Sequence, residues 1–390
     1  MTGELFAGGY AGRRVLVTGH TGFLGSWAVR WLSALGAEVA GYSRGERVAD
    51  ASSATSATSA SGGMRVFAGD VADAGRVAAA MAAFRPEIVL HLAGNTVVAA
   101  GFRDPAATFR GNVGGTAAVL DAATRQESVR CVVVTGTPAV SRLNDNLQLG
   151  PYAASKLAVE ACVAAFAHSR TQQDAGRVSP LGIGLARPGV MIGGDWAEGR
   201  LLADVVRAIR QERPVTLAAP AAVRPWQHVL DGLGGALMLA ARLGAGPAPR
   251  RRYEFGCRDH VTGMSVQDVV AGFLSAYGLP GWPVRVGDGT GQPVNRGADD
   301  IVELGYAAAR ADLGWQPVWD LSRALRACAA WYQAAQARPD SLGAVMDEQI
   351  AAYTADASRV WAAYPAATAD PAAAATAATA ATGPVRAGAT

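Results

Sequence analysis

The stretch Val15-Leu16-Val17-Thr18-Gly19-His20-Thr21-Gly22-Phe23-Leu24-Gly25 decides the fold of this chain. It begins with a short apolar run, continues with three glycines spaced by three residues, and leads into a segment of helical period. Large apolar side chains recur at every fourth position of that segment, at Phe23, Trp27, Trp31 and Leu35. A buried strand, a glycine-rich turn and an amphipathic helix in this order are typical of the first unit of a doubly wound α/β sheet that binds a dinucleotide.

Each glycine of this turn has its own task in such a site. Gly19 permits the tight turn after the strand, Gly22 lets the backbone approach a pyrophosphate, and Gly25 lets the helix pack closely on the sheet. The free N–H groups at the start of the helix then face the phosphates. The alternative is a glycine-rich turn that binds nothing, and the strand and helix on either side favour the dinucleotide site.

The alternation of apolar runs and helical segments continues through residue 186. We expect strands at residues 15–18, 38–42, 65–68, 88–91, 132–135 and 182–186. The pattern predicts an α/β fold in which residues 1–186 form an NAD(P)-binding domain with a Rossmann-type, doubly wound parallel sheet. Residues 187–335 are less regular, and we expect them to form mainly a smaller C-terminal substrate-binding lobe, with some elements returning to the first domain.

The composition limits the other classes of protein. Of the 390 residues, 50% are hydrophobic and 17% are charged, and the basic residues behind the net charge of +3 are scattered. This composition excludes a chain that is disordered throughout, and the scattered basic residues do not form the cluster that is typical of nucleic-acid binding. The sequence contains no apolar run of about 20 residues, so it predicts no membrane-spanning helix. The chain starts without an apolar signal core, so we expect a cytoplasmic protein.

Two segments of low complexity stand apart from this globular body. Residues 49–63 are almost purely Ala, Ser, Thr and Gly, which predicts a surface loop. Residues 336–390 drift into Ala and Thr repeats, and we expect a partly disordered tail with a frayed helix at its start. The four cysteines are widely spaced, so we expect reduced packing residues and no metal site.

The ends of the other strands supply further candidate cofactor contacts. Asp70 follows the third strand, where it could accept a hydrogen bond from an adenine amine, and Gly94 closes the loop after the fourth strand. Where an acidic residue would bind the 2′-hydroxyl of an NAD ribose, after the second strand, the chain has Ser43-Arg44. Arg44 either meets the 2′-phosphate of NADP or is a solvated residue that opens a loop.

Tyr152 and Lys156 stand four residues apart and therefore share one face of a helix. A nearby ammonium lowers the pKa of a phenol, so that the phenol can take a proton from an alcohol as hydride leaves for a cofactor. With the hydroxyls of Thr135 and Thr137, they are our candidate catalytic residues, and NAD, or NADP through Arg44, is the expected cofactor. The candidate cofactor contacts are Gly19, Thr21, Gly22, Phe23, Leu24, Gly25, Ser43, Arg44, Asp70, Val71, Leu92, Ala93, Gly94, Tyr152 and Lys156.

These residues belong to a longer series of motifs. The series comprises residues 19–27, 85–93, Asn112-Val113 with Thr116, 152–156, 192–197, 224–229 and 313–321. In them, from about Arg14 to Tyr332, the chain resembles the extended short-chain dehydrogenase/reductase family of NAD-dependent epimerases and dehydratases. The His of the first loop and the run Arg-Pro-Trp-Gln-His at 224–228 resemble its CDP-glucose 4,6-dehydratase branch most closely.

The resemblance implies a substrate and its contacts. It implies a CDP-glucose-like nucleotide sugar that lies between the two lobes, with its C4 hydroxyl near Tyr152. It implies substrate contacts from Arg200, Arg224 and His228, and a homodimer formed through two helices of the sheet domain. Arg224 stands beside a proline and an aromatic residue, where it either binds a phosphate or stacks on Trp226.

The end of the fifth strand departs from the family pattern. The dehydratases carry Asp and a second proton-transfer residue, Lys in the CDP-glucose branch, where this chain has Thr137 and Pro138. Loss of water needs a base for the C5 proton and an acid for the C6 hydroxyl, and neither residue titrates near neutral pH. We therefore predict C4 oxidation with the usual dehydration pair missing. Asp145, in the next loop, is either a replacement carboxyl or a turn former.

Three functions are compatible with these residues. The first is a nucleotide-sugar enzyme, either a dehydratase with altered residues or an epimerase or ketoreductase. The second is a paralogue that binds the cofactor without turnover, and the third is a plain dehydrogenase of a small alcohol. Hydride transfer separates the first from the second, and nucleotide-sugar binding separates the first from the third.

Overall fold

The computed structural model describes residues 2–45, 64–138, 140, 150–173, 180–257, 264–287 and 304–363. Three of our predictions lie outside these residues: the surface loop at 49–63, the role of Asp145, and the disorder of the tail beyond residue 363. The account below concerns the described residues.

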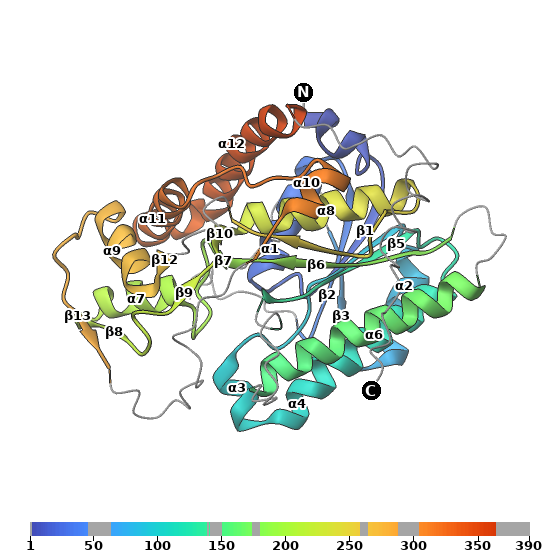
Figure 1. The fold of residues 1–390 in the computed structure, drawn as a ribbon, viewed down its shortest axis with the longest axis horizontal. Coiled ribbons are helices and arrows are strands. Elements are labelled where there is room, and N and C mark those ends of the chain that lie inside the picture. Colours follow the sequence, from blue (N-terminus) through green and yellow to red (C-terminus); the bar gives the residue numbers. More distant parts are fainter. Residues whose placement is uncertain are drawn as a thin grey trace, which may run out of the picture.

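A seven-stranded parallel sheet in the order β11-β6-β5-β4-β1-β2-β3 forms the centre of the molecule (Figure 1). Its strands are β1 (Arg14–Thr18), β2 (Glu38–Ser43), β3 (Arg65–Ala68), β4 (Ile88–His91), β5 (Cys131–Thr135), β6 (Gly182–Pro188) and β11 (Arg252–Phe255). The predicted doubly wound α/β fold is confirmed. The strand order reverses between β1 and β4, and such a switch point is where these sheets bind ligands.

The seventh strand, β11, comes from the C-terminal half of the chain and pairs with β6 at the edge of the sheet. Our strand predictions did not include it, because it lies in the less regular part of the chain beyond residue 186. Tyr253 and Phe255 are buried, whereas the residues between and before them are not. This alternation is that of a strand with one covered face.

Helices cover both faces of the sheet, and each face has an apolar core of its own. Val15 and Val17 of β1 belong to one core and Leu16 to the other, because successive side chains of a strand point to opposite faces. The first core is covered by α1 (Phe23–Ala34) and α8 (Val229–Ala245), and the second by α2 (Ala74–Phe84), α5 (Gly115–Arg125) and α6 (Pro151–Gln173) (Figure 1).

Smaller elements form a lobe at one end of the sheet, at the left of Figure 1. They are α7 (Leu201–Arg210), α9 (Val266–Ala276) and the strand pairs β7 (Val190–Ile192) with β10 (Trp226–His228), β8 (Val215–Leu217) with β13 (Val284–Val286), and β9 (Val223–Arg224) with β12 (Met264–Ser265). The remaining elements are η1 (Thr2–Gly8), α3 (Val98–Arg103), α4 (Pro105–Phe109), the π-helical turn η2 (Arg110–Gly114), α10 (Ala307–Leu313), α11 (Leu321–Ala337), η4 (Pro339–Ser341) and α12 (Leu342–Ala362). Within the described ranges, no helix combines the length and apolarity needed to span a bilayer.

The last helix, α12, is packed against the body of the molecule, which corrects our prediction of a frayed helix. Its hydroxyl and indole side chains reach across to other elements: Tyr353 donates to Oδ1 of Asp231 at 2.8 Å, and Trp361 donates to the carbonyl of Gln316 at 2.8 Å. The many alanines hid a buried stripe at helical spacing. That stripe consists of Leu342, Met346, Ile350, Tyr353, Thr354, Ala357 and Trp361.

Candidate active site

The three glycines of the first loop lie where β1 turns into α1, and their surroundings differ. A Cβ on Gly19 would lie 2.8 Å from the backbone of Ala93, and a Cβ on Gly25 would lie 2.1 Å from the carbonyl oxygen of Gly19. Gly19 also has a φ of +73°, which favours glycine. A Cβ on Gly22 would meet only the carbonyl of Gly19, at 3.2 Å. The turn itself therefore requires Gly19 and Gly25, whereas Gly22 leaves backbone open toward a ligand.

A cavity of about 800 Å³ opens at the ends of β1 to β4. The predicted cofactor contacts that line it are Gly19, Thr21, Gly22, Ser43, Arg44, Asp70, Val71, Leu92, Ala93 and Gly94. Phe23, Leu24, Gly25, Tyr152 and Lys156 are not among its lining residues. Its open backbone at Gly22 and its row of small and polar residues fit an extended dinucleotide. The described part of the chain holds no group of three or more His, Cys, Asp or Glu that is arranged to bind a metal ion.

Tyr152 and Lys156 lie one turn apart on α6, at the end of β5. The ammonium of Lys156 donates to the carbonyl of Thr135 at 3.1 Å, and the hydroxyl of Tyr152 is hydrogen-bonded to the side chain of Thr137. The structure thus brings the side chain of Lys156 to the backbone of Thr135 and the side chain of Tyr152 to that of Thr137, whereas the buried hydroxyl of Thr135 has no hydrogen-bond partner among the described residues. Pro138 follows Thr137 and is buried.

Burial and neighbouring groups set the protonation of this pair. Burial lowers the pKa of Lys156 to about 8, although the carboxylate of Glu160 opposes this effect. Burial raises the pKa of Tyr152, while the hydrogen bond from Thr137 and the positive charge of Arg200 lower it. At neutral pH the ammonium is therefore mostly charged, as a proton-transfer pair requires.

Asn112 is a site residue that our sequence analysis quoted only as part of a motif. It lies in the π-helical turn η2, where its Oδ1 accepts from the backbone N–H of Asn95 at 2.6 Å and its Nδ2 donates to Ser155 at 2.9 Å. Ser155 in turn donates to the carbonyl of Tyr152 at 2.8 Å. Asn112 therefore joins the loop after β4 to the start of α6. A π-turn has no period that the sequence reveals.

His91 lies behind this site in a chain of buried hydrogen bonds. Its Nδ1 is 2.8 Å from the hydroxyl of Thr18, and its Nε2 is 3.1 Å from the hydroxyl of Thr116. Because Thr116 donates its own proton to the carbonyl of Asn112 at 2.6 Å, Nε2 of His91 must be the donor and Nδ1 the acceptor. Burial and the charge of Lys156 lower the pKa of His91 to about 3, so it is a neutral link between β1, β4 and η2.

The predicted substrate residues lie in the C-terminal lobe in unlike surroundings. Arg224 is half-buried and donates to the carbonyl of Val223 at 2.8 Å. His228 is completely buried, its ring centre 5.7 Å from that of Trp27 and 4.8 Å from that of Trp319, and burial lowers its pKa to about 3. It caps α8 and has no exposed surface with which to contact a substrate. We therefore leave His228 out of the substrate site.

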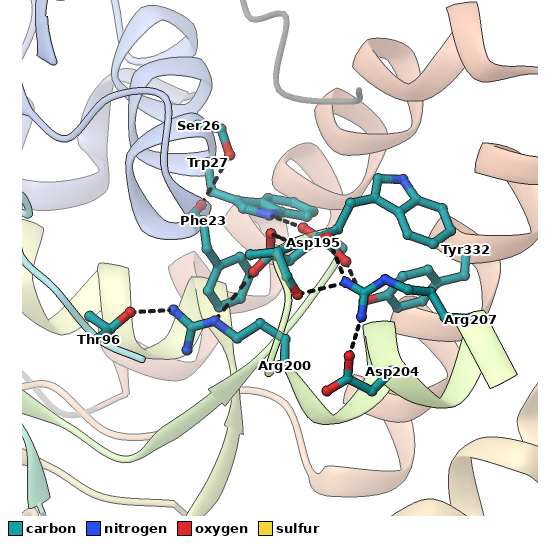
Figure 2. A network of polar contacts seen from close by, with 12 residues as sticks. Phe23, Ser26, Trp27, Thr96, Asp195, Arg200, Asp204, Arg207 and Tyr332 are labelled. Atoms are coloured by element: carbon teal, nitrogen blue, oxygen red, sulfur yellow. Dashed lines mark hydrogen bonds and ion pairs between the residues drawn. The ribbon is translucent and has the colours of Figure 1, made fainter. Parts of the chain in front are cut away.

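Arg200 lies at the start of α7 and reaches back to the sheet domain (Figure 2). It donates to the hydroxyl of Thr96 at 3.0 Å, lies 3.4 Å from a carboxylate oxygen of Asp195, and sits 5.5 Å from the ring centre of Phe23. Thr96 lines the cavity described above. The predicted arginine therefore stands at the edge of the cofactor cavity.

Three features define a short-chain dehydrogenase/reductase of the extended type. They are a Rossmann-type sheet with this glycine turn, a tyrosine and a lysine one helical turn apart beyond the fifth strand, and a C-terminal lobe. The chain belongs to the NAD dependent epimerase/dehydratase family, whose sequence profile matches residues 15–256. The resemblance seen in the sequence is thereby confirmed.

Two characterised proteins show the extent of the sequence similarity. The chain is 31% identical to CDP-glucose 4,6-dehydratase of Salmonella typhimurium over 341 residues, which cover 83% of this chain and 92% of that protein. It is 26% identical to UDP-glucose 4-epimerase of Mycolicibacterium smegmatis over 321 residues, which cover 78% of this chain and 93% of that protein.

Solved structures share the fold at lower identity. UDP-glucose 4-epimerase of Thermotoga maritima, solved with UDP-glucose, matches with a TM-score of 0.67 at 19% identity, covering 82% of this chain and 98% of that one. A double mutant of the dTDP-glucose 4,6-dehydratase DesIV of Streptomyces venezuelae, solved with NAD and DAU bound, matches with a TM-score of 0.65 at 22% identity, covering 82% and 97%.

Proposed function

We propose that this protein is an NAD(P)-dependent enzyme that oxidises C4 of a nucleotide sugar resembling CDP-glucose, without the usual acid/base pair of dehydration. The proposal rests on the residues at the end of β5. There the side chain of Thr137 is hydrogen-bonded to the hydroxyl of Tyr152, and the next residue is Pro138. Tyr152 and Lys156 supply what oxidation needs. Membership of the family and the similarity to CDP-glucose 4,6-dehydratase support the class of substrate.

The side chains divide the work of oxidation between them. When bound, a nicotinamide supplies the acceptor for a hydride. As a phenolate, Tyr152 takes the proton of the sugar hydroxyl and later returns it, and the ammonium of Lys156 stabilises the phenolate. Thr137 orients the phenol through its hydrogen bond. None of these tasks requires a further titratable residue.

Dehydration requires two more proton transfers. A base must remove the C5 proton and an acid must protonate the departing C6 hydroxyl. Threonine and proline offer neither at neutral pH. The protein is therefore a poor dehydratase, and an epimerase or ketoreductase reaction is the outcome that the remaining residues support.

The cavity bears on the choice of cofactor as well. At its β2 end it is lined by Ser43 and the exposed Arg44, in place of a carboxylate that would bind a ribose 2′-hydroxyl. NAD fits the family, and structures in it are described with NAD. We infer that Arg44 adds affinity for the 2′-phosphate of NADP.

The test of oxidation follows the hydrogen on C4. CDP-glucose carrying deuterium at C4 is incubated with the protein and each cofactor, and the label is followed by mass spectrometry in sugar and cofactor. With the wild type we expect the deuterium to appear on the cofactor or to return to a C4 of inverted configuration, which NMR of the sugar detects. Neither change should occur with Tyr152→Phe, while Tyr306→Phe, outside the site, behaves as the wild type. Tight cofactor binding with neither labelled cofactor nor a C4 epimer from CDP-, UDP- or dTDP-glucose would instead favour a paralogue without turnover.

A further inference from the structure

Two loops flank the point where the strand order reverses, between β1 and β4. The glycine turn after β1 leads into Phe23, and the loop after β4 contains Thr96, which lines the cavity described above. In doubly wound sheets a dinucleotide lies in the crevice between two such loops. A side chain that contacts both loops therefore spans the crevice in which the cofactor is expected.

Arg200 makes contacts with both of these loops (Figure 2). Its guanidinium donates to the hydroxyl of Thr96 at 3.0 Å and lies 5.5 Å from the ring centre of Phe23. The side chain of Arg200 is 34% exposed, so it lies at the surface of the molecule and not in the apolar core. Arg200 thus bridges the crevice from the side of the C-terminal lobe.

The turn before Arg200 holds this bridge in place. The guanidinium lies 3.4 Å from a carboxylate oxygen of Asp195, whose side chain is 6% exposed. The carbonyl of Asp195 accepts from the hydroxyl of Tyr332 at 2.7 Å, and the carbonyl of Gly194 accepts from Nε1 of Trp27 at 3.2 Å. Because Asp195 offsets the charge of the guanidinium, the bridge acts through its contacts and not by attracting an anion.

Phe23 is anchored by the same turn. Its side chain is buried, and a Cβ added to Gly193 would lie 3.0 Å from its ring, so the turn after β7 packs directly on Phe23. On the β1 side the bridge therefore rests on a packed ring. On the β4 side it rests on the hydrogen bond from Arg200 to Thr96, and breaking this bond separates the loop after β4 from Arg200.

We propose that Arg200 is a gate residue: its bridge between the glycine turn and the loop after β4 closes the crevice and limits both the entry and the release of the dinucleotide. Both partners of the guanidinium belong to this chain, so the bridge needs no ligand to form. A dinucleotide that enters or leaves across the bridge has to break the hydrogen bond between Arg200 and Thr96, and such opening steps set many exchange rates. The inference concerns cofactor exchange and does not depend on the reaction proposed above.

Rapid mixing of the full-length protein with NADH measures both rates. Association is followed by energy transfer from tryptophan to NADH, and release by displacement of bound NADH with excess NAD. We expect Arg200→Ala to raise both rate constants about three- to tenfold, because a hydrogen bond to a charged group is lost, and to leave the affinity nearly unchanged. Unchanged rate constants would overturn the proposal. Faster release with unchanged association would make Arg200 a direct cofactor contact and would overturn it as well.

A double-mutant cycle tests the hydrogen bond itself. Thr96→Val removes the acceptor hydroxyl and keeps the size of the side chain. We expect it to raise both rate constants, and we expect Arg200→Ala to add little in that background. Independent effects of the two substitutions would overturn the proposal.

The matched control is Arg210→Ala, at the far end of α7, where this arginine lies over the ring of Trp196 at 5.6 Å. We expect its rate constants to equal those of the wild type. Equal acceleration in Arg210→Ala would point to a loosened helix and would overturn the gate. Fast exchange in Arg200→Ala, without turnover of any nucleotide sugar by the wild type, would sustain the gate and reject the proposed function.

Discussion

Protonation at single residues decides what this site can do. The ammonium of Lys156 donates to the carbonyl of Thr135. Burial lowers its pKa to about 8, so it is still mostly charged at neutral pH although burial disfavours the charge. Tyr152 has no strong acidity of its own, because burial raises its pKa. The hydrogen bond from Thr137 and the charge of Arg200 lower this pKa and so oppose the effect of burial. The site therefore depends on charges that the fold stabilises poorly, which is common at catalytic centres.

The burial of Lys156 has a measurable cost in stability. Its pKa falls from 10.5 in the unfolded chain to about 8 in the fold, so we expect Lys156→Met to raise the free energy of unfolding by about 1 to 3 kcal/mol at pH 7. Between pH 8 and 10.5 the unfolded wild type holds a proton that the folded form lacks. The stability of the wild type therefore rises with pH over this range, and the difference in stability between the wild type and Lys156→Met narrows. Urea unfolding at a series of pH values measures both effects. A variant that is less stable at pH 7 would contradict this account, and the variant should be inactive.

Arg44 sets the preference between the two cofactors. We expect Arg44→Ala to lower the affinity for NADP about tenfold and to leave the affinity for NAD unchanged, because only NADP carries the 2′-phosphate. Fluorescence titration with both cofactors measures this. The control is Arg125→Ala, an exposed arginine on α5 that pairs with Asp121 away from the cavity. Equal loss of both affinities, or no loss of either, would reject the 2′-phosphate contact.

At the scale of elements, the turn between β1 and α1 carries the cofactor site. We expect Gly22→Val to fold normally and to lose cofactor binding, because the only atom that a Cβ meets is the carbonyl of Gly19 at 3.2 Å while Gly22 lines the cavity. Circular dichroism and cofactor titration measure fold and binding separately. Binding equal to that of the wild type would place the phosphates elsewhere.

A second substitution in the same turn serves as the contrast. We expect Gly25→Ala to disturb the fold, with a lower melting temperature, because its Cβ would lie 2.1 Å from the carbonyl of Gly19. Gly114→Ala should change neither property, since no atom lies within 4 Å of its added Cβ. A stable Gly25→Ala variant would contradict the tight packing of the turn.

The elements differ in how far the sequence predicts them. The six strands of the sheet domain end within two residues of their expected limits, since each is a short, mainly apolar run beside a turn. The turn η2 was missed because a π-turn has no period that the sequence reveals, and the strand β11 was missed because it lies beyond residue 186, where the alternation of strands and helices becomes less regular. The helix α12 was expected but its packing was not, because it was read together with the Ala- and Thr-rich tail that follows it. Tyr152, Lys156 and the glycines were found because their chemistry fixes their spacing.

At the scale of the whole molecule, the contacts between distant segments escape the sequence. Arg200 with Thr96 and Asp231 with Tyr353 are separated by 104 and 122 residues. No local pattern predicts such pairs. The first pair joins the start of α7 to the loop after β4, and the second joins α8 to α12. The homodimer implied by the family resemblance stays a prediction, which sedimentation velocity would measure.

The contact between α12 and α8 lends itself to a stability test. Asp231 is completely buried, and its Oδ1 accepts from Tyr353 at 2.8 Å and from the N–H of Val318 at 2.7 Å. We expect Tyr353→Phe to lower the free energy of unfolding by about 1 to 3 kcal/mol, because a buried carboxylate loses a donor. Cofactor affinity should not change. Urea unfolding without loss of stability would show that α12 contributes little through this bond.

The mass of the product formed from CDP-glucose is the most direct measurement of the central claim. The wild type is incubated with CDP-glucose and NAD or NADP, and the sugar nucleotide is analysed by mass spectrometry together with the absorbance of reduced cofactor. We predict reduced cofactor or a product of unchanged mass, and neither in Tyr152→Phe, because Thr137 and Pro138 replace a pair that contributes about 10² to 10⁴ in rate for each member. Rapid formation of a product lighter by one water would contradict the account and direct attention to Asp145.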